Sequence, residues 1–181
     1  MSRASDTFGR SILDAENLLK HFNALNSKPP PPEIEVLKRA GLVMAMTAWE
    51  TYVEDRVLEA ADERLGALTD QSIAALVQSK LDEEIKRLNN PTADKTLALF
   101  RDYAGVDVAD HWSWNSNDQK AIRDRLNQYV KLRGDVVHRS RPIEPGPPRA
   151  HPVTKEDLER AIRFLKNLVQ ATERAFPAKP V

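Results

Sequence analysis

The sequence predicts an all-α protein, a helical bundle built around one long central helix. Hydrophobic residues recur every three to four positions along most of the 181 residues, which is the period of an amphipathic helix. No segment alternates apolar and polar residues as a half-buried strand does. The chain has six glycines, and most of its 12 prolines fall in two clusters, at residues 27–32 and 141–152. We therefore expect helices joined by proline-rich loops, in a single domain over residues 1–181 with an ordered core at about 10–175.

Six helices are expected from this periodicity and from the residues that interrupt it. They cover residues 6–26, 33–65, 69–88, 92–103, 118–138 and 154–176, with an ordered loop at 104–117. The second segment is apolar on every side around residues 40–49, which is typical of a helix covered by neighbours, and Gly41 there permits close approach of another helix. Thr69 is the expected N-cap of the third helix. Thr154, with Asp157 three residues later, predicts a capping box at the last one.

Composition limits the classes of function. The 27 basic and 27 acidic residues give a formal net charge of zero, so no overall charge attracts the chain to nucleic acid or membranes. The absence of cysteine excludes a thiol nucleophile, disulfides and Cys-ligated zinc, and it suits a cytoplasmic protein. His21, His111 and His151 lack metal-ligand spacing, so we expect neither a metal nor a cofactor. The longest apolar run is about half of a bilayer span, and no membrane association is expected.

Local charge is uneven. Residues 120–141 carry seven basic and two acidic side chains, whereas residues 50–70 carry seven acidic and two basic ones. A solvated helix face is the simplest explanation of the basic run. A basic strip on an otherwise neutral chain is also typical of a protein that binds phosphates.

Arg133 falls in the apolar stripe of the fifth predicted helix, one turn after Tyr129. An arginine side chain stays charged, so at such a position it needs a carboxylate, a phosphate or a water-filled groove. Glu50, Glu54 or Asp135 would supply the carboxylate of a structural ion pair. A bound phosphate is the functional alternative.

His138 follows Arg133 after four intervening residues, where the fifth helix is expected to end. Metal-independent RNA cleavage needs a base for the 2′-OH, an acid for the leaving 5′-oxygen and a cation for the charged phosphorane. Histidine can serve as base or acid, and arginine can bind the phosphate. Five residues turn an ideal helix through about 500°, which leaves the two side chains about 140° apart. They converge only if the helix ends before His138 or if two copies face each other. A histidine that ends a helix because the helix dipole favours it is the structural alternative.

Residues 133–138, Arg-Gly-Asp-Val-Val-His, resemble the R-x(4–6)-H motif of the HEPN superfamily, helical-bundle proteins that include many toxin and defence ribonucleases. A second segment, Ala-Trp-Glu-Thr-Tyr-Val-Glu at 48–54, resembles the aromatic and acidic signature of the RiboL-PSP-HEPN branch. The order of the helices also agrees with that branch. The sequence departs from the pattern at Gly134, where many members have a polar residue, often Asn.

The resemblance implies a metal-independent endoribonuclease of the toxin, defence or RNA-processing type. It would form a homodimer whose two motifs meet in a cleft, and its product would carry a 2′,3′-cyclic phosphate. Arg133 would hold the phosphate, His138 would be base or acid, and Asp135 would be an auxiliary polar group. The RNA backbone would be bound by Lys131, Arg139 and Arg141. RNA or a nucleotide, and an antitoxin or defence protein, are the implied partners.

Two other functions are compatible with the same residues. One is a non-catalytic HEPN-like module that binds a nucleotide or a partner protein, which the departure at Gly134 favours. The other is a helical assembly protein without a ligand.

Overall fold

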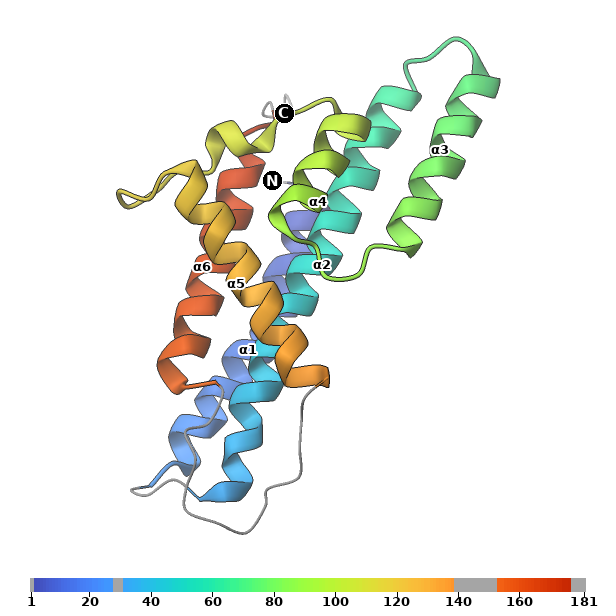
Figure 1. The fold of residues 1–181 in the computed structure, drawn as a ribbon. Coiled ribbons are helices and arrows are strands. Elements are labelled where there is room, and N and C mark those ends of the chain that lie inside the picture. Colours follow the sequence, from blue (N-terminus) through green and yellow to red (C-terminus); the bar gives the residue numbers. More distant parts are fainter. Residues whose placement is uncertain (1, 28–30, 139–152, 177–181) are drawn as a thin grey trace.

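A computed structural model describes residues 2–27, 31–138 and 153–176, and within these ranges the chain is helical with no strand (Figure 1). The all-α prediction is therefore confirmed. The helices are α1 (Arg3–Leu25), α2 (Glu35–Leu65), α3 (Gln71–Lys86), α4 (Ala93–Leu99), α5 (Gln119–His138) and α6 (Lys155–Glu173). The shorter elements are the 3-10 turns η1 (Pro32–Ile34) and η3 (Val108–His111) and the π-helical turn η2 (Phe100–Ala104). The predicted proline-rich loop at 141–152 and residues 28–30 of the first connector lie outside the described residues.

The long helix α2 is the central element of the bundle. It packs against α1, α5 and α6, while α3 leans away from its C-terminal half (Figure 1). Trp49 and Tyr52 are fully buried on α2 and stack on each other with ring centroids 5.6 Å apart. A Cβ atom added at Gly41 would lie 2.7 Å from Leu158 Cδ2, so this glycine lets α6 approach α2 closely, as predicted.

Charged side chains of α2 hold the neighbouring helices in place. Arg56 Nε donates a 3.0 Å hydrogen bond to Glu173 Oε1 on α6, and the Tyr52 hydroxyl donates to the same oxygen at 2.8 Å. Glu59 Oε1 accepts a hydrogen bond from the backbone N–H of Arg3 at the start of α1. A buried charge requires hydrogen-bonding partners of this kind. Some of the acidic residues at 50–70, such as Glu59, therefore have a structural role.

Several helix N-termini are capped by a side chain that precedes them in the sequence. Thr154 and Asp157 form the predicted capping box, each side chain accepting a backbone hydrogen bond at 3.0 Å. The expected N-cap at Thr69 is wrong, because Asp70 occupies that position and its carboxylate accepts from Ser72 N and Ile73 N. A carboxylate there also interacts favourably with the helix dipole, which a hydroxyl does not.

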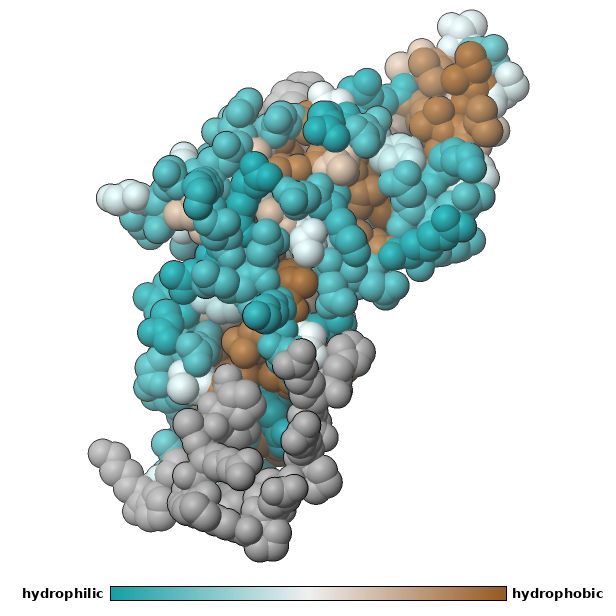
Figure 2. All heavy atoms as spheres, in the orientation of Figure 1, coloured by the Kyte–Doolittle hydropathy of each residue, from teal (hydrophilic) through white to brown (hydrophobic). Residues whose placement is uncertain are grey.

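The outer end of α3 exposes apolar side chains (Figure 2). Leu68, Ile73 and Leu76 are 40, 52 and 62% exposed, whereas Leu81 in the second half of α3 is fully buried. This end of α3 therefore projects beyond the core. None of the helices in the described ranges combines the length and the hydrophobicity that a membrane crossing requires.

Candidate functional site

Arg133 on α5 is held between two other elements. Its Nη1 donates a 2.6 Å hydrogen bond to Asn90 Oδ1, in the loop between α3 and α4. Its Nη2 lies 3.7 Å from Glu50 Oε2 on α2, which is within ion-pair distance but too long for a hydrogen bond. Glu50 is one of the three carboxylates that the sequence offered as ion-pair partners of Arg133, and it lies beside the guanidinium in the structure.

The guanidinium is incompletely satisfied. The side chains of Arg133 and Glu50 are 21% and 19% exposed, so both charges are largely shielded from water. Arg133 Nε is buried, and no residue in the described ranges accepts a hydrogen bond from it. A buried, unmet N–H on a charged group costs free energy. The arrangement is therefore a structural ion pair in which about a fifth of the arginine side chain, 21%, remains exposed.

Asn90 is the residue of this cluster that the sequence did not reveal. The Asn-Asn-Pro segment at 89–91 indicates a helix stop, and α3 does end before it. Asn90 has a φ of +56°, in the left-handed region that asparagine tolerates better than most residues. No sequence signal around Asn90 indicated its hydrogen bond to Arg133, because the two residues are 43 positions apart.

The basic strip of α5 is partly neutralised by acidic residues. Lys120 pairs with Asp124 one turn later at 2.8 Å, and Arg123 pairs with Asp94 of α4 at 2.6 Å. Lys131 is exposed, and no carboxylate in the described part of the chain lies within ion-pair distance of it. Fewer positive charges of α5 are therefore unpaired than the sequence suggests, because Arg123 pairs with a carboxylate of α4 and Arg133 with one of α2.

His138 is the last residue of α5, and its side chain, like Arg139 and Arg141, lies outside the described residues. Because α5 runs through to His138, the possibility that the helix ends before it is wrong. Positions 133 and 138 are therefore about 140° apart around the helix and about 7.5 Å apart along it. The two positions therefore lie on different faces of α5.

Gly134 and Asp135 lie between these two residues, and both are half-buried. A Cβ atom added at Gly134 would meet nothing within 4 Å among the described atoms. Glycine at this position is therefore not required by packing, because a Cβ atom fits there.

The acidic residues of α2 near Arg133 influence one another. Burial raises the pKa of Glu54, and the charges of Glu50 and Asp55 raise it further.

Among the described residues, no group of three or more His, Asp or Glu side chains is close enough together to hold a metal ion.

The fold and this cluster define a class of protein, an all-helical bundle with an arginine on the penultimate helix held against the central one. A family model described as RiboL-PSP-HEPN matches residues 10–177, nearly the whole chain. The chain belongs to the RiboL-PSP-HEPN family and hence to the HEPN superfamily, as the two motif-like segments indicated. The comparisons with curated proteins and with solved structures found no match.

Proposed function

We propose that this protein is a metal-independent endoribonuclease that cleaves single-stranded RNA. A histidine removes the 2′-OH proton, the 2′-oxygen attacks phosphorus, the bond to the 5′-oxygen breaks, and that oxygen takes up a proton. The products are a 2′,3′-cyclic phosphate and a 5′-hydroxyl. His138 supplies the base or the acid, and Arg133 stabilises the charged phosphorane.

The observation that carries this proposal is the half-satisfied guanidinium of Arg133. It is oriented by the 2.6 Å hydrogen bond to Asn90 and the charge of Glu50, while 21% of its side chain is exposed and can be reached by a ligand. An oriented cation costs no reorganisation when a negative charge develops next to it. Family membership supports the same activity, because the RiboL-PSP-HEPN proteins are themselves regarded as candidate ribonucleases.

The site is composed of two copies of the chain in a two-fold dimer. One copy provides Arg133 and the other provides His138, since the two positions diverge by about 140° on one helix. In a two-fold dimer both combinations form, so the dimer has two equivalent sites. Asp135 acts as an auxiliary polar group within the motif.

The RNA backbone is bound next to this site by Lys131, Arg139 and Arg141. Lys131 is exposed on α5 and, seven residues before position 138, lies on nearly the same face of the helix as that position. Such contacts neutralise phosphates without reading the bases, so they contribute affinity that falls with salt concentration. The proposed location is cytoplasmic, where RNA and an antitoxin or defence partner would both be present.

Cleavage of a mixed single-stranded RNA in EDTA, followed by mass spectrometry of the products, tests the proposal. His138→Ala should lower the rate by about 10²–10⁴-fold, and Arg133→Ala by about 10²–10³-fold. His21→Ala and Arg10→Ala are matched controls, because both residues are exposed on α1. Equal activity of all four variants would show that any cleavage comes from a contaminant or from another site.

A non-catalytic module is the second candidate, and Gly134 is the observation that favours it. If the wild-type protein binds RNA without cutting it, Gly134→Asn restores the polar residue common in the family at a position where an added Cβ atom meets nothing within 4 Å. Cleavage gained by this variant would support a module that lost activity through the glycine. Continued inactivity of Gly134→Asn would leave binding as the function.

A further inference from the structure

A second concentration of positive charge lies on the side of α5 that faces α6. An open hollow of about 300 Å³ is lined by α5, α6 and the loop before α5, and we refer to it as the α5–α6 hollow. Three arginines line it, Arg125 from α5 and Arg160 and Arg163 from α6. Its volume is at the lower end of the range typical of small-molecule sites.

No carboxylate lines the α5–α6 hollow in the described residues. Arg160 donates a 2.8 Å hydrogen bond to Asp157 at its edge, so its charge is partly compensated. Arg125 and Arg163 have no ion-pair partner within the described ranges, and both are exposed. Three like charges that converge on one hollow repel one another, and an anion bound between them relieves this repulsion.

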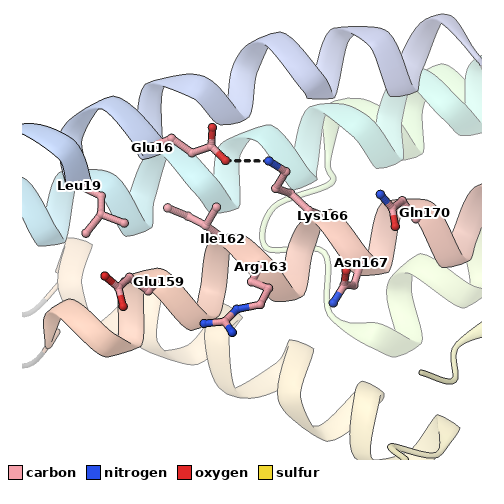
Figure 3. A pocket seen from close by; sticks show the side chains of 8 residues that line it. All are labelled: Glu16, Leu19, Glu159, Ile162, Arg163, Lys166, Asn167 and Gln170. Carbon is pink, nitrogen blue, oxygen red and sulfur yellow. Dashed lines mark hydrogen bonds and ion pairs between the residues drawn. The ribbon is translucent and has the colours of Figure 1, made fainter. Parts of the chain in front are cut away.

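A neighbouring hollow on the other side of α6 provides the contrast. It has a volume of about 400 Å³ and is lined by Glu16 and Glu159 as well as Lys166 and Arg163 (Figure 3). Lys166 reaches across to Glu16 on α1 in a 2.8 Å ion pair, so the charges there are already balanced. Arg163 lines both hollows, but the excess of positive charge is on the α5 side.

An aromatic wall accompanies the arginines. The Phe164 ring centroid lies 5.7 Å from that of Trp114 and 5.4 Å from that of Tyr129. Trp114 is partly exposed, whereas the other tryptophan of the loop, Trp112, is fully buried and donates to Thr172. Trp114 therefore offers part of an indole to the hollow, and aromatic side chains of this kind stack on nucleobases.

Polar groups complete the hollow. The side-chain amides of Asn115, Asn117 and Asn167 line it and can both donate and accept hydrogen bonds. Burial raises the pKa of the Tyr129 hydroxyl, while the positive charges of Arg125 and Arg160 lower it. This hydroxyl therefore lies in the field of two of the three arginines, at the boundary between the basic and the aromatic parts.

The hollow is separate from the Arg133 cluster. Arg125 and Arg133 are eight residues apart, about 12 Å along α5, and their partners lie on different elements. Arg133 contacts Asn90 and α2, whereas Arg125 faces α6. Neither of the two hollows is lined by Arg133.

We propose that the α5–α6 hollow binds a nucleotide, with the phosphate between Arg125 and Arg163 and the base against Trp114. The nucleotide is either free or one unit of a single-stranded RNA, since both present the same phosphate and base. The proposal does not depend on cleavage at Arg133 and His138. Arg160 contributes less to the phosphate because it is already paired with Asp157.

Tryptophan fluorescence and isothermal titration calorimetry test this with four probes. These are AMP, adenosine, inorganic phosphate and a 2′-O-methyl oligoadenylate, which cannot be cleaved through a 2′-oxygen. AMP should bind with a Kd below about 1 mM, and more tightly than phosphate or adenosine alone. An oligoadenylate that binds about tenfold more tightly than AMP would identify RNA as the ligand, and equal affinity would identify a free nucleotide. No binding of either AMP or the oligoadenylate would overturn the proposal.

Variants locate the binding. Arg125→Gln and Arg163→Gln should each weaken AMP binding by about tenfold, because each removes a hydrogen bond to a charged group. Arg10→Gln, an exposed arginine on α1, should leave the affinity unchanged. Both hollow arginines are exposed, so the melting temperature should not fall. Undiminished AMP binding by the Arg125→Gln, Arg163→Gln double variant would overturn the assignment.

Discussion

Arg133 Nη1 and Asn90 Oδ1 are joined by a 2.6 Å hydrogen bond that links α5 to the loop between α3 and α4. The two residues are 43 positions apart in the sequence. Because Arg133 has one hydrogen bond and one longer ion pair in the described structure, the asparagine is the group that sets its direction. The guanidinium of the proposed active site thus depends on a loop that is not part of the motif.

Asn90→Gly tests this dependence, because glycine tolerates the positive φ while removing the side-chain acceptor. We expect RNA cleavage to fall by about tenfold or more, since a misplaced catalytic group is costly. Asn89→Gly in the neighbouring exposed position is the matched control. Wild-type rates for Asn90→Gly would show that Glu50 alone orients the arginine.

Arg133→Ala should lower the free energy of unfolding by about 1–2 kcal/mol, between the effects seen for exposed and for fully buried ion pairs. The physical reason is that Glu50, which is 19% exposed, loses the cation beside it. Glu50→Gln should recover part of this loss in the Arg133→Ala background. Urea denaturation of the two single variants and the double variant gives the coupling energy, and a value of zero would contradict an interaction between them.

Mixing two inactive variants tests the composite dimer site. A dimer of Arg133→Ala with His138→Ala keeps one intact site, composed of Arg133 from one copy and His138 from the other. After subunits exchange in an equal mixture, half of the dimers are mixed, so about one quarter of the wild-type activity should return. Light scattering should give twice the 20.4 kDa chain mass. A strict monomer, or no recovery on mixing, would contradict the two-copy site.

Gly134→Ala should stabilise the protein by about 1 kcal/mol, because alanine favours a helix over glycine and the added Cβ meets nothing within 4 Å. Gly9→Ala in α1 should behave alike for the same reason. Gly41→Val should instead destabilise the fold by about 1–3 kcal/mol, because its Cβ would collide with Leu158. Chemical denaturation of the three variants distinguishes an open position from a packed one.

Glu54→Gln should increase stability at pH 7, and the gain should disappear in acid. The folded state raises the pKa of Glu54, so it disfavours the carboxylate relative to the unfolded chain. Below about pH 4 the residue is protonated in both states and no penalty remains. As the pH rises through the folded pKa, the penalty develops in the wild type but not in the glutamine variant. Thermal melts of both proteins at acidic and neutral pH measure this difference, and an equal gain at both would contradict it.

Much of the architecture was predictable because it depends on local signals. Thr154 and Asp157 are three residues apart, and their capping box needs no information from the rest of the chain. The uniformly apolar stretch around Gly41 indicated a helix covered on all sides, and α2 is that helix. Thr69 was a wrong N-cap because two adjacent residues both suit the role, and the stronger acceptor, Asp70, occupies it.

The sequence by itself determined the helical fold, the position of the Arg133 to His138 segment on α5, and the family to which these residues point. It also placed Arg133 on an apolar stripe. The tertiary structure decided which groups meet that arginine. Asn90 and Glu50 come to it from separate elements, and the three arginines of the α5–α6 hollow converge from two helices. Helical periodicity specifies which face of a helix is buried, but only packing selects the neighbour that covers it.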